Sequence, residues 1–326
     1  MEFSPRIYNL ALAWNWQYDE DFIRLIEEMA HARRLTTYVI QQHNLDETLE
    51  LLQKRKLEFH FILDRASDED ERFQPLAHLV ARRSLSTDSS PPIHIINTYD
   101  LLKRAADKAI MHLEFLARGL EVPYTIIISP YAHKREVELS LTELARLGRP
   151  FIIKPANTTG GGIGVVLGAE SLKDIIETRQ RHKNDKYLLQ EKVRPAYLVD
   201  NKAWFRVFYA FGSIVACWWD DQTHLYEEIT AGAEETFGLG TLRSITQMIQ
   251  EICQLDFFST EIVHTLDQKF VVVDYVNEIC DMRLQSRFPD GVPDRVVHAI
   301  GTSLVNLVHR SVHSQAPKDS SLALWT

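Results

Sequence analysis

Four glycines that follow a lysine form the sharpest chemical pattern in this sequence. The glycines are Gly160, Gly161, Gly162 and Gly164. Closely spaced glycines let backbone amides approach a phosphate without side-chain clashes. Lys154 ends an apolar run, where an ammonium is costly unless it meets an anion. We therefore expect a phosphate-binding loop, with a plain turn and a lysine that reaches solvent as the structural alternatives.

The residues around these glycines exclude the commoner phosphate-binding loops. No G-K-[ST] ending follows, as a Walker P-loop requires, and the pattern predicts a following strand rather than the helix of a dinucleotide fingerprint. The kinase motifs V-A-I-K, H-R-D and D-F-G are absent from the sequence. A glycine loop between two strands can fold over a nucleotide as a flap, and we expect that arrangement.

An ordered set of motifs around the loop resembles the ATP-grasp superfamily. In chain order the set comprises Asp107-Lys108, Lys154 within 150–155, the loop 158–165, Gln190-Glu191 and Val193 within 188–193, Arg206 within 204–208, and Asp274 with Asn277 within 271–277. Each motif is weak alone, and their joint order carries the resemblance. It covers about residues 95–310 and implies a two-lobed ATP-grasp domain behind an N-terminal domain.

The resemblance implies an ATP-dependent ligase. Such an enzyme phosphorylates a carboxylate to an acyl phosphate, and an amine or thiol then displaces the phosphate. A small-molecule kinase of the same superfamily and a non-catalytic nucleotide-binding protein are the alternatives. The kinase would need a cationic pocket for a polyanionic acceptor, and Arg and Lys cluster only modestly outside the ATP motifs. The expected partners are a small-molecule carboxylate and a nucleophile.

The resemblance also assigns ATP contacts to individual residues. Lysines would meet the phosphates, and the end of a strand would meet adenine through side chains and the backbone amide of Val193. Asp200 is the nearest acid for the ribose, although Trp204 stands where related enzymes often have an acidic residue. The expected ATP-binding residues are Lys108, Lys154, Thr159, Gly160, Gly161, Gly162, Gln190, Glu191, Val193 and Asp200.

Two arginines are the expected catalytic residues. Arg206 lies in an apolar strand and would face phosphate, with a structural ion pair as the alternative. Arg283 follows the acidic strand and would anchor a substrate carboxylate or phosphate, and Arg287 is a second candidate for that role.

The resemblance further implies a Mg²⁺ site, which Mn²⁺ would also suit. The expected ligands are Glu261, Asp274 and Asn277. Family members commonly place the acid and the asparagine two residues apart, whereas Asp274 and Asn277 are three apart. A bulge or a strand end must therefore re-aim one of them. Without such a bend, Glu278 would replace Asn277.

The elements that position these residues predict an α/β and α+β protein. Strands at 7–14, 37–40 and 59–63 alternate with helices at 19–33 and from 44 on, which indicates a β-α-β domain with a parallel sheet. We expect this N-terminal domain over 1–95, with a linker at 84–92. We expect an ATP-grasp domain over 96–314, with lobes of about 96–195 and 196–314, and a loose tail over 315–326.

The second domain contains several predicted elements that matter below. They are helices at 98–119, 136–147, 171–181, 242–255 and 294–309, strands at 151–154, 165–167 and 187–193, and hairpins at 204–219 and 260–274.

Composition is that of an ordinary globular chain. The chain has 326 residues, 45% of them hydrophobic, and a net charge of −9. That charge argues against a generally basic nucleic-acid-binding surface, and no apolar run approaches the length of a membrane span. Three widely spaced cysteines suggest no disulfide framework. We expect a cytoplasmic protein without nucleic-acid or membrane partners, with a homodimer as one option.

Overall fold

The computed structural model describes residues 4–68, 70–84, 93–157 and 163–314. The chain divides into two compact units, which are described separately. Unit 1 comprises Met1–Ile96, Met282–Leu284 and Val297–Thr326, and unit 2 comprises Asn97–Asp281 and Gln285–Val296. The expected tail at 315–326 and most of the expected linker, 85–92, lie outside the described residues.

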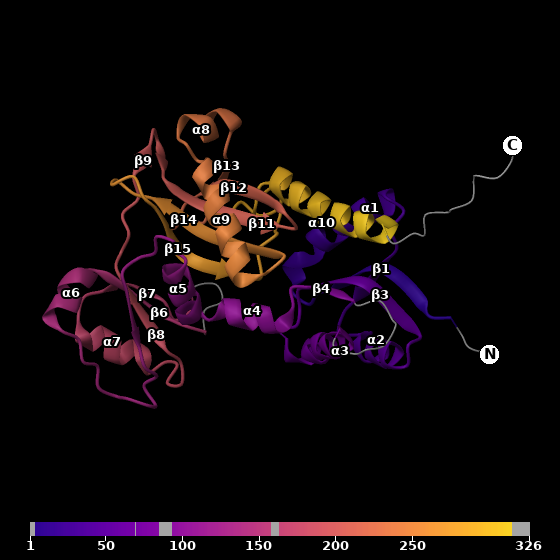
Figure 1. The fold of residues 1–326 in the computed structure, drawn as a ribbon, viewed down its shortest axis with the longest axis horizontal. Coiled ribbons are helices and arrows are strands. Elements are labelled where there is room, and N and C mark those ends of the chain that lie inside the picture. The colour runs from indigo at the N-terminus through magenta and orange to yellow at the C-terminus, as the bar shows by residue number, and fades with distance from the viewer. Residues whose placement is uncertain (1–3, 69, 85–92, 158–162, 315–326) are drawn as a thin grey trace, which may run out of the picture. The chain divides into compact units, whose positions relative to one another are not determined.

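Unit 1 is built on a parallel sheet with the strand order β2-β1-β3-β4, as the β-α-β pattern predicted. The helices α2 and α3 lie on one face of this sheet and α1 on the other (Figure 1). The elements are β1 (Arg6–Ala13), α1 (Glu20–Ala32), β2 (Thr37–Ile40), α2 (Leu45–Gln53), β3 (Leu57–Asp64), α3 (Gln74–Ser84), β4 (His94–Ile96) and α10 (Asp294–Ser314).

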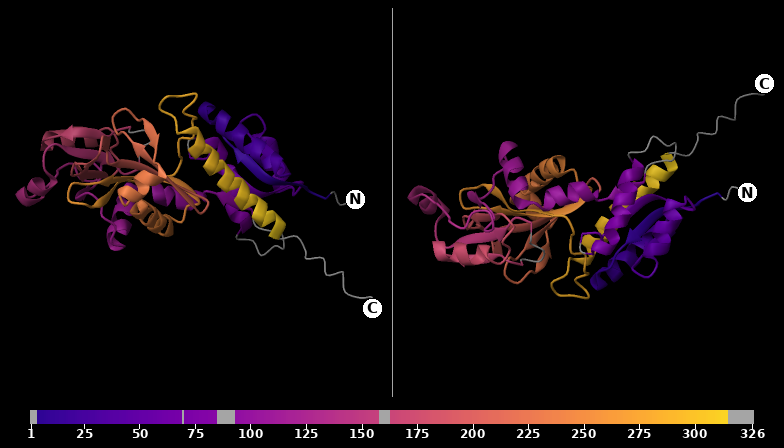
Figure 2. Two further views of the ribbon diagram at one scale, coloured as in Figure 1. Left: turned by 90° about the horizontal axis from the view of Figure 1, so that it is seen from above. Right: turned by 90° about the horizontal axis from the view of Figure 1, so that it is seen from below.

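The last helix, α10, is grouped with a different unit from the one that the predicted domain boundary gave it. The sequence placed it in the second domain, whereas the structure groups it from Val297 onward with unit 1. There α10 runs beside α1 (Figure 1, Figure 2). Gly301 permits this approach, because a Cβ at that position would lie 3.1 Å from the Sδ of Met29. Hydrophobic periodicity identified the helix but not its partner.

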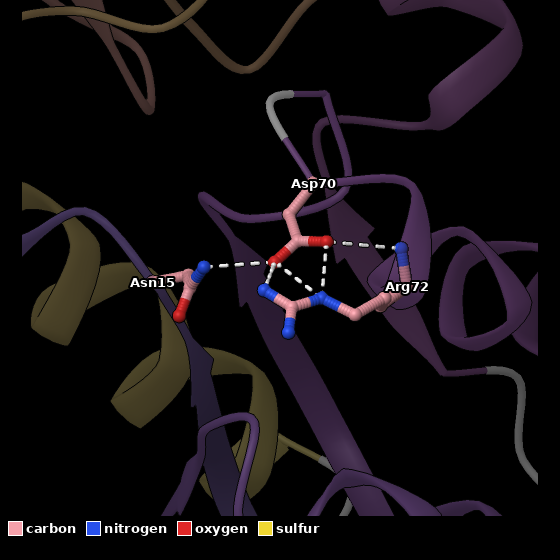
Figure 3. Close-up of polar contacts among 3 residues, drawn as sticks. All are labelled: Asn15, Asp70 and Arg72. Carbon is pink, nitrogen blue, oxygen red and sulfur yellow. Dashed lines mark hydrogen bonds and ion pairs between the residues drawn. The ribbon is translucent and has the colours of Figure 1, made fainter.

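Two polar contacts join the loops that follow β1 and β3. Arg65 and Asp19 form a buried bidentate ion pair, with Nε–Oδ2 at 2.8 Å and Nη2–Oδ1 at 2.7 Å. Nearer the solvent, Asp70 accepts hydrogen bonds from the side chains of Asn15 and Arg72 (Figure 3). These contacts fix the loops at the carboxyl edge of the sheet.

Among its described residues, unit 2 has two larger antiparallel sheets and one two-stranded sheet. One of the larger sheets has the order β5-β8-β6-β7 and the other β13-β12-β11-β14-β15. The strands of the first are β5 (Thr125–Ile128), β6 (Phe151–Pro155), β7 (Val166–Ala169) and β8 (Tyr187–Gln190). The strands of the second are β11 (Trp204–Ala210), β12 (Ser213–Trp219), β13 (Tyr226–Glu228), β14 (Phe257–His264) and β15 (Phe270–Asn277). Beside them lie a small hairpin and six helices, namely β9 (Tyr197–Leu198), β10 (Asn201–Lys202), α4 (Tyr99–Ala106), α5 (Lys108–Ala117), α6 (Leu141–Leu147), α7 (Leu172–Arg179), α8 (Ala231–Thr236) and α9 (Gly240–Cys253).

One face of the five-stranded sheet is apolar and covered by helices. Phe205, Val207 and Tyr209 alternate along β11 and pack in one hydrophobic cluster with residues of α5 and α9. Arg206 falls between them in the sequence, so its side chain belongs to the opposite face. The sheet therefore separates a dry core from a face that carries charge.

Several predicted elements of unit 2 end elsewhere in the structure. The helix expected at 98–119 is two helices, because Asp107 has an extended backbone (ψ 97°) and accepts hydrogen bonds from the amides of Ala109 and Ile110. The helix expected from 136 begins only after Ser140, which forms a capping box with Glu143. The strand expected at 187–193 ends at 190, and β9, β10, β13 and α8 were not anticipated.

The structure also bears on what composition suggested about membrane spans and about the cysteines. Within the described residues, no helix combines the length and apolarity that crossing a bilayer requires. All three cysteines are buried thiols.

Candidate active site

The charged face of the five-stranded sheet gathers the predicted catalytic arginine and the predicted metal ligands. Arg206 on β11 pairs in register with Glu261 on β14, which in turn pairs with Asp274 on β15. Asn277 pairs with Ser259, two residues from Glu261 on the same strand. Paired positions share a sheet face, so these side chains line one surface.

The strand β15 bends between Asp274 and Asn277. The register with β14 shifts between the pairs at Ser259 and Glu261, so β15 has one more residue than its partner there. Tyr275 and Val276 are consecutive, yet both pack in the hydrophobic cluster with α5 and α9, which breaks the alternation of a regular strand. The bend predicted from the three-residue spacing is therefore present, and Asn277 returns to the charged face.

Arg206 is held from several sides. Its Nη2 lies 2.7 Å from Oε1 of Glu261, and its guanidinium stands 4.8 Å over the ring of Trp219. With its amide oriented to suit its neighbours, Asn277 accepts from Nη1 at 3.2 Å. Burial, the largest single influence, disfavours the charged form, but Glu261 together with Tyr226 and Asp274 raises the pKa of Arg206.

One atom of this guanidinium has no partner. The Nε of Arg206 is buried and lacks a hydrogen bond to any residue that the structure describes. A buried N–H without an acceptor is costly. Its presence on the charged face indicates a position that an anionic ligand would complete.

Two lysines add positive charge next to Asp274. Burial alone would raise the pKa of this carboxyl, but Lys108, Lys154 and Arg206 hold it below the usual value. Burial lowers the pKa of Lys154, and Lys108 adds to the lowering, while Asp274 and Glu261 oppose it. The Nζ of Lys154 donates to the carbonyl of Val273 at 3.0 Å. Three cations thus converge on one carboxylate.

The break between α4 and α5 places Lys108 at this cluster. Asp107 caps α5 and pairs with Lys186 at 3.0 Å. The backbone amide of Lys108 donates to the carbonyl of Ala156 at 3.0 Å, just beyond β6. Burial would raise the pKa of Asp107, but the amide of Ile110 and the ammonium of Lys186 lower it. The hydrogen bond of its backbone amide therefore holds Lys108 in place, at the start of α5 and not within the long continuous helix that the sequence predicted.

The residues predicted to meet adenine are engaged within the chain. The Nε2 of Gln190 donates to both Tyr275 and Thr125, at 2.7 and 3.1 Å. The Oε1 of Glu191 accepts from the amide of Tyr124 at 2.7 Å. Val193 packs beside a small apolar cluster on the five-stranded sheet. Their side chains shape the end of β8.

The structure does not bring every predicted residue to this face. Asp200 is exposed in the turn between β9 and β10. Arg283 falls in the segment Met282–Leu284, which is grouped with unit 1, whereas Arg206 belongs to unit 2.

The predicted glycine loop falls largely outside the described residues. That applies to Thr159, Gly160, Gly161 and Gly162. Gly164 is described and has φ of +77°, and a Cβ there would lie 3.2 Å from the Cγ of Pro155. Glycine is therefore required at 164 by both conformation and space.

The donor set on the charged face consists of oxygen atoms. Among the described residues no group of three or more His, Cys, Asp and Glu side chains is arranged to hold a metal ion. Glu261, Asp274 and Asn277 supply two carboxylates and an amide. Mg²⁺ usually takes only one or two carboxylates from protein and the rest from phosphate and water. The residues present therefore fit Mg²⁺ shared with a nucleotide.

Trp219 and Tyr275 were not among the predicted site residues. Trp219 covers the guanidinium of Arg206, and its indole also stacks on His224 at 5.4 Å. Trp219 lies on the same side of β12 as Cys217, which pairs with Arg206, so its contact depends on the strand register and not on a local pattern. Tyr275 likewise had no local signal, because regular alternation would not place two successive residues on one face.

Comparisons with known proteins bear on the fold. Neither protein-family models nor curated protein sequences yield a match. Among solved structures, a RimK domain protein ATP-grasp from Sphaerobacter thermophilus is similar, with 20% identity, a TM-score of 0.60, and coverage of 91% of this chain and 98% of that one.

Two further solved structures are similar over most of their length. D-alanine–D-alanine ligase from Bacillus anthracis, complexed with ATP, has 16% identity and a TM-score of 0.59, covering 95% of this chain and 98% of its own. The ATP-grasp ligase PsnB, complexed with minimal precursor, Mg and ADP, has 14% identity and a TM-score of 0.59, covering 94% and 98%. Identities this low speak for the fold alone.

Proposed function

Because the chain has the ATP-grasp fold, we propose that it is an ATP-dependent ligase that activates a carboxylate. A carboxylate oxygen attacks the γ-phosphorus of ATP, and the bond to the ADP oxygen breaks, giving an acyl phosphate. An amine or thiol then attacks the acyl carbon, loses its proton, and phosphate departs with the electron pair of the C–O bond.

One observation carries this proposal. Three cations, Lys108, Lys154 and Arg206, surround oxygen donors on one sheet face, and the Nε of Arg206 is buried without a partner among the described residues. A triphosphate supplies negative charge and acceptors that complete such a cluster, and preorganised cations stabilise the transferring phosphoryl group. An ion pair with a purely structural role would not leave additional cations and an N–H donor without an acceptor.

Mg²⁺, or Mn²⁺ in its place, would be held by Glu261, Asp274 and Asn277. The metal would neutralise charge on the phosphates when bound. The lowered pKa of Asp274 keeps this ligand ionised at neutral pH. Oε1 of Glu261 pairs with Arg206 and Oε2 accepts from the indole of Trp204, so the metal would share one of these oxygens with its present partner.

The remaining roles concern orientation. The end of β8, at Gln190, Glu191 and Val193, would receive adenine, and Asp200 would meet the ribose. Arg206 would contact the phosphoryl group during transfer. Arg283, or Arg287, would anchor the carboxylate substrate. The residues 159–162 would cover the phosphates.

Two alternatives use the same nucleotide site. A small-molecule kinase would transfer the phosphoryl group to a hydroxyl, and a non-catalytic protein would bind ATP without turnover. The retention of Lys154, Arg206 and Asp274 on one cluster favours turnover. The ligase stands first because D-alanine–D-alanine ligase and PsnB are ligases by name.

The test is a hydroxylamine trap. The full chain is incubated with Mg·ATP and pooled small carboxylates and peptides, with and without hydroxylamine. A ligase releases ADP and phosphate and forms a hydroxamate, because hydroxylamine intercepts the acyl phosphate. ADP release with a phosphorylated product and no hydroxamate would identify the kinase. A chain whose melting midpoint does not rise with Mg·ATP would sink the ATP-binding proposal itself.

A matched pair of variants separates the site from the fold. Asp274→Asn should abolish Mg²⁺-dependent turnover while the melting midpoint stays near that of the wild type. Asp267→Asn, in the exposed turn of the same hairpin, should leave turnover unchanged. Full turnover in Asp274→Asn would remove the proposed metal site.

A further inference from the structure

The hydroxyl of Tyr275 is the centre of a buried hydrogen-bond network. Tyr275 directly follows Asp274 on β15 and is 2% exposed. Its ring meets Phe115 of α5 edge-on at 5.3 Å. The hydroxyl lies 2.7 Å from Nδ1 of His112 and 2.7 Å from Nε2 of Gln190. These two partners belong to α5 and β8, so one oxygen atom joins three elements.

The hydrogen bonds of this network form one consistent arrangement. Burial lowers the pKa of His112 to about 4, so its ring is neutral at neutral pH. The amide nitrogen of Gln190 donates to the Tyr275 oxygen, and with His112 in its Nε2-protonated tautomer the Tyr275 hydroxyl donates to Nδ1. The second hydrogen of Gln190 goes to Thr125, whose hydroxyl donates to the carbonyl of Pro123. Such a fully paired network holds its members in one arrangement.

The three joined elements carry the residues assigned above to the two ends of ATP. Gln190 ends β8, next to the expected adenine contacts. Asp274, the expected metal ligand, is bonded directly to Tyr275 in the chain. On α5, Lys108 lies one turn before His112, on the same side of the helix.

We propose that Tyr275 is a positioning residue that fixes the metal ligand Asp274 relative to the adenine-binding end of β8. This inference rests on the proposed function. The hydroxyl touches neither nucleotide nor metal; it acts through Gln190 and His112. Binding of adenine at β8 then places the β- and γ-phosphates opposite a carboxylate that is already aimed at the shared metal. The bond from Lys154 to the carbonyl of Val273 is a second tie to the same strand.

The experiment compares ADP binding with and without Mg²⁺ by calorimetry on the full chain. The quantity of interest is the affinity gain that Mg²⁺ adds, because it reports how well Asp274 meets the nucleotide. In Tyr275→Phe we expect this gain to fall about tenfold, while the affinity for ADP in EDTA changes less than about threefold. We expect this difference if the adenine site and the metal site lose their fixed spacing. A protein that is weakened uniformly would lose affinity for ADP in EDTA as well.

Two kinds of control make the result specific. Tyr187→Phe removes the hydroxyl of a tyrosine that is also buried, on the same strand as Gln190, and the two hydrogen bonds of this hydroxyl go to the backbone of His182 and Thr178. It should lower the melting midpoint and leave the Mg²⁺ gain intact. His112→Asn keeps an acceptor near the Nδ1 position and should preserve most of the gain, whereas His112→Leu should lose it. If Tyr275→Phe does not fold, the His112 pair gives the same readout.

The outcomes separate this inference from the function on which it rests. A wild-type chain that binds ADP with a Mg²⁺ gain shared equally by Tyr275→Phe overturns the positioning role alone. A wild-type chain that binds no adenine nucleotide in either condition overturns the proposed function, and the positioning role with it.

Discussion

Two buried arginine–carboxylate pairs in this chain are built in opposite ways. In unit 1, Arg65 meets Asp19 through two parallel bonds of 2.8 and 2.7 Å, and the side chains are 2% and 1% exposed. In unit 2, Arg206 meets Glu261 through one 2.7 Å contact, and its Nε is left without a partner among the described residues.

The surroundings of the two pairs differ as well. The guanidinium of Arg65 stands over Phe22 at 5.4 Å, and its pair closes a gap between loops. Arg206 shares its site with Lys108, Lys154 and Asp274, so charges remain that are not matched one to one. A saturated pair can only hold a fold together. An unsaturated cluster of the same residue types is open to a charged ligand.

Breaking the saturated pair should give the largest effect on stability. Asp19→Ala leaves the guanidinium of Arg65 buried without its counter-charge, and such a loss costs about 3–5 kcal/mol of unfolding free energy. Denaturant unfolding of the full chain measures it. The double variant Asp19→Leu with Arg65→Met should recover much of the loss, because no charge is then stranded. A loss below about 1 kcal/mol in Asp19→Ala would contradict the structural role.

Acidification should give the next largest effect, because it should change the stability of the two units differently. His112 in unit 2 has a folded pKa of about 4, below its usual 6.5. The unfolded state therefore takes up the proton first, and stability falls between pH of about 6.5 and 4, by at most about 1.4 kcal/mol per pH unit. In unit 1, burial raises the pKa of Asp64. The folded state there holds its proton more tightly, so stability rises as pH falls through that raised value.

Hydrogen exchange resolved by peptide, corrected for intrinsic rates, can follow both units in one sample. Protection in unit 2 should drop from pH 6.5 toward 4.5 more than protection in unit 1, where the pKa of His309 is also lowered. His112→Asn removes one titrating group of unit 2 and should weaken its response, which His264, whose pKa is also lowered, then retains in part. An equal drop in both units would show that His112 does not set the difference.

Removing the unsaturated arginine should give the smallest change in stability and a clear change in binding. Arg206→Met should weaken Mg·ADP binding by about 10- to 100-fold, which is the loss of one or two charged hydrogen bonds of about 1.5–3 kcal/mol in all. Glu261 keeps the indole of Trp204 as a donor, so unfolding free energy should fall less than in Asp19→Ala. If Arg206→Met left the nucleotide affinity unchanged and strongly lowered the unfolding free energy, the Arg206–Glu261 pair would be structural, like the Arg65–Asp19 pair.

The order of motifs was sufficient to predict the fold and the elements that carry the site. Hydrophobic periodicity identified the parallel sheet of unit 1 and the hairpins of unit 2, because each places one face in a core. The resemblance to the ATP-grasp superfamily singled out Arg206, Glu261 and Asp274, and the structure pairs them across neighbouring strands. Their chemical roles remain predictions that the experiments above address.

The remaining features depend on contacts between distant residues. The break at Asp107 arises because its carboxylate caps α5 and meets Lys186, 79 residues away; periodicity alone continued the helix. The grouping of α10 with unit 1 depends on Gly301 beside Met29. The engagement of Gln190 with Tyr275 joins two sheets, and no local pattern reveals such a bond.

The extra residue between Asp274 and Asn277, one of two by which β15 exceeds β14, changes how this strand should be aligned with related sequences. Between the pairs at Glu261 and Ser259, the ladder would be regular if Val276 were absent, and Asn277 would still oppose Ser259. A one-residue deletion in a sheet normally turns every later side chain to the wrong face. Here it would leave both faces in place and remove only a buried valine. Chains in which the acid and the amide are two residues apart and chains in which they are three apart can therefore place both on the same face. A gap at this point of an alignment does not by itself indicate a different chemistry.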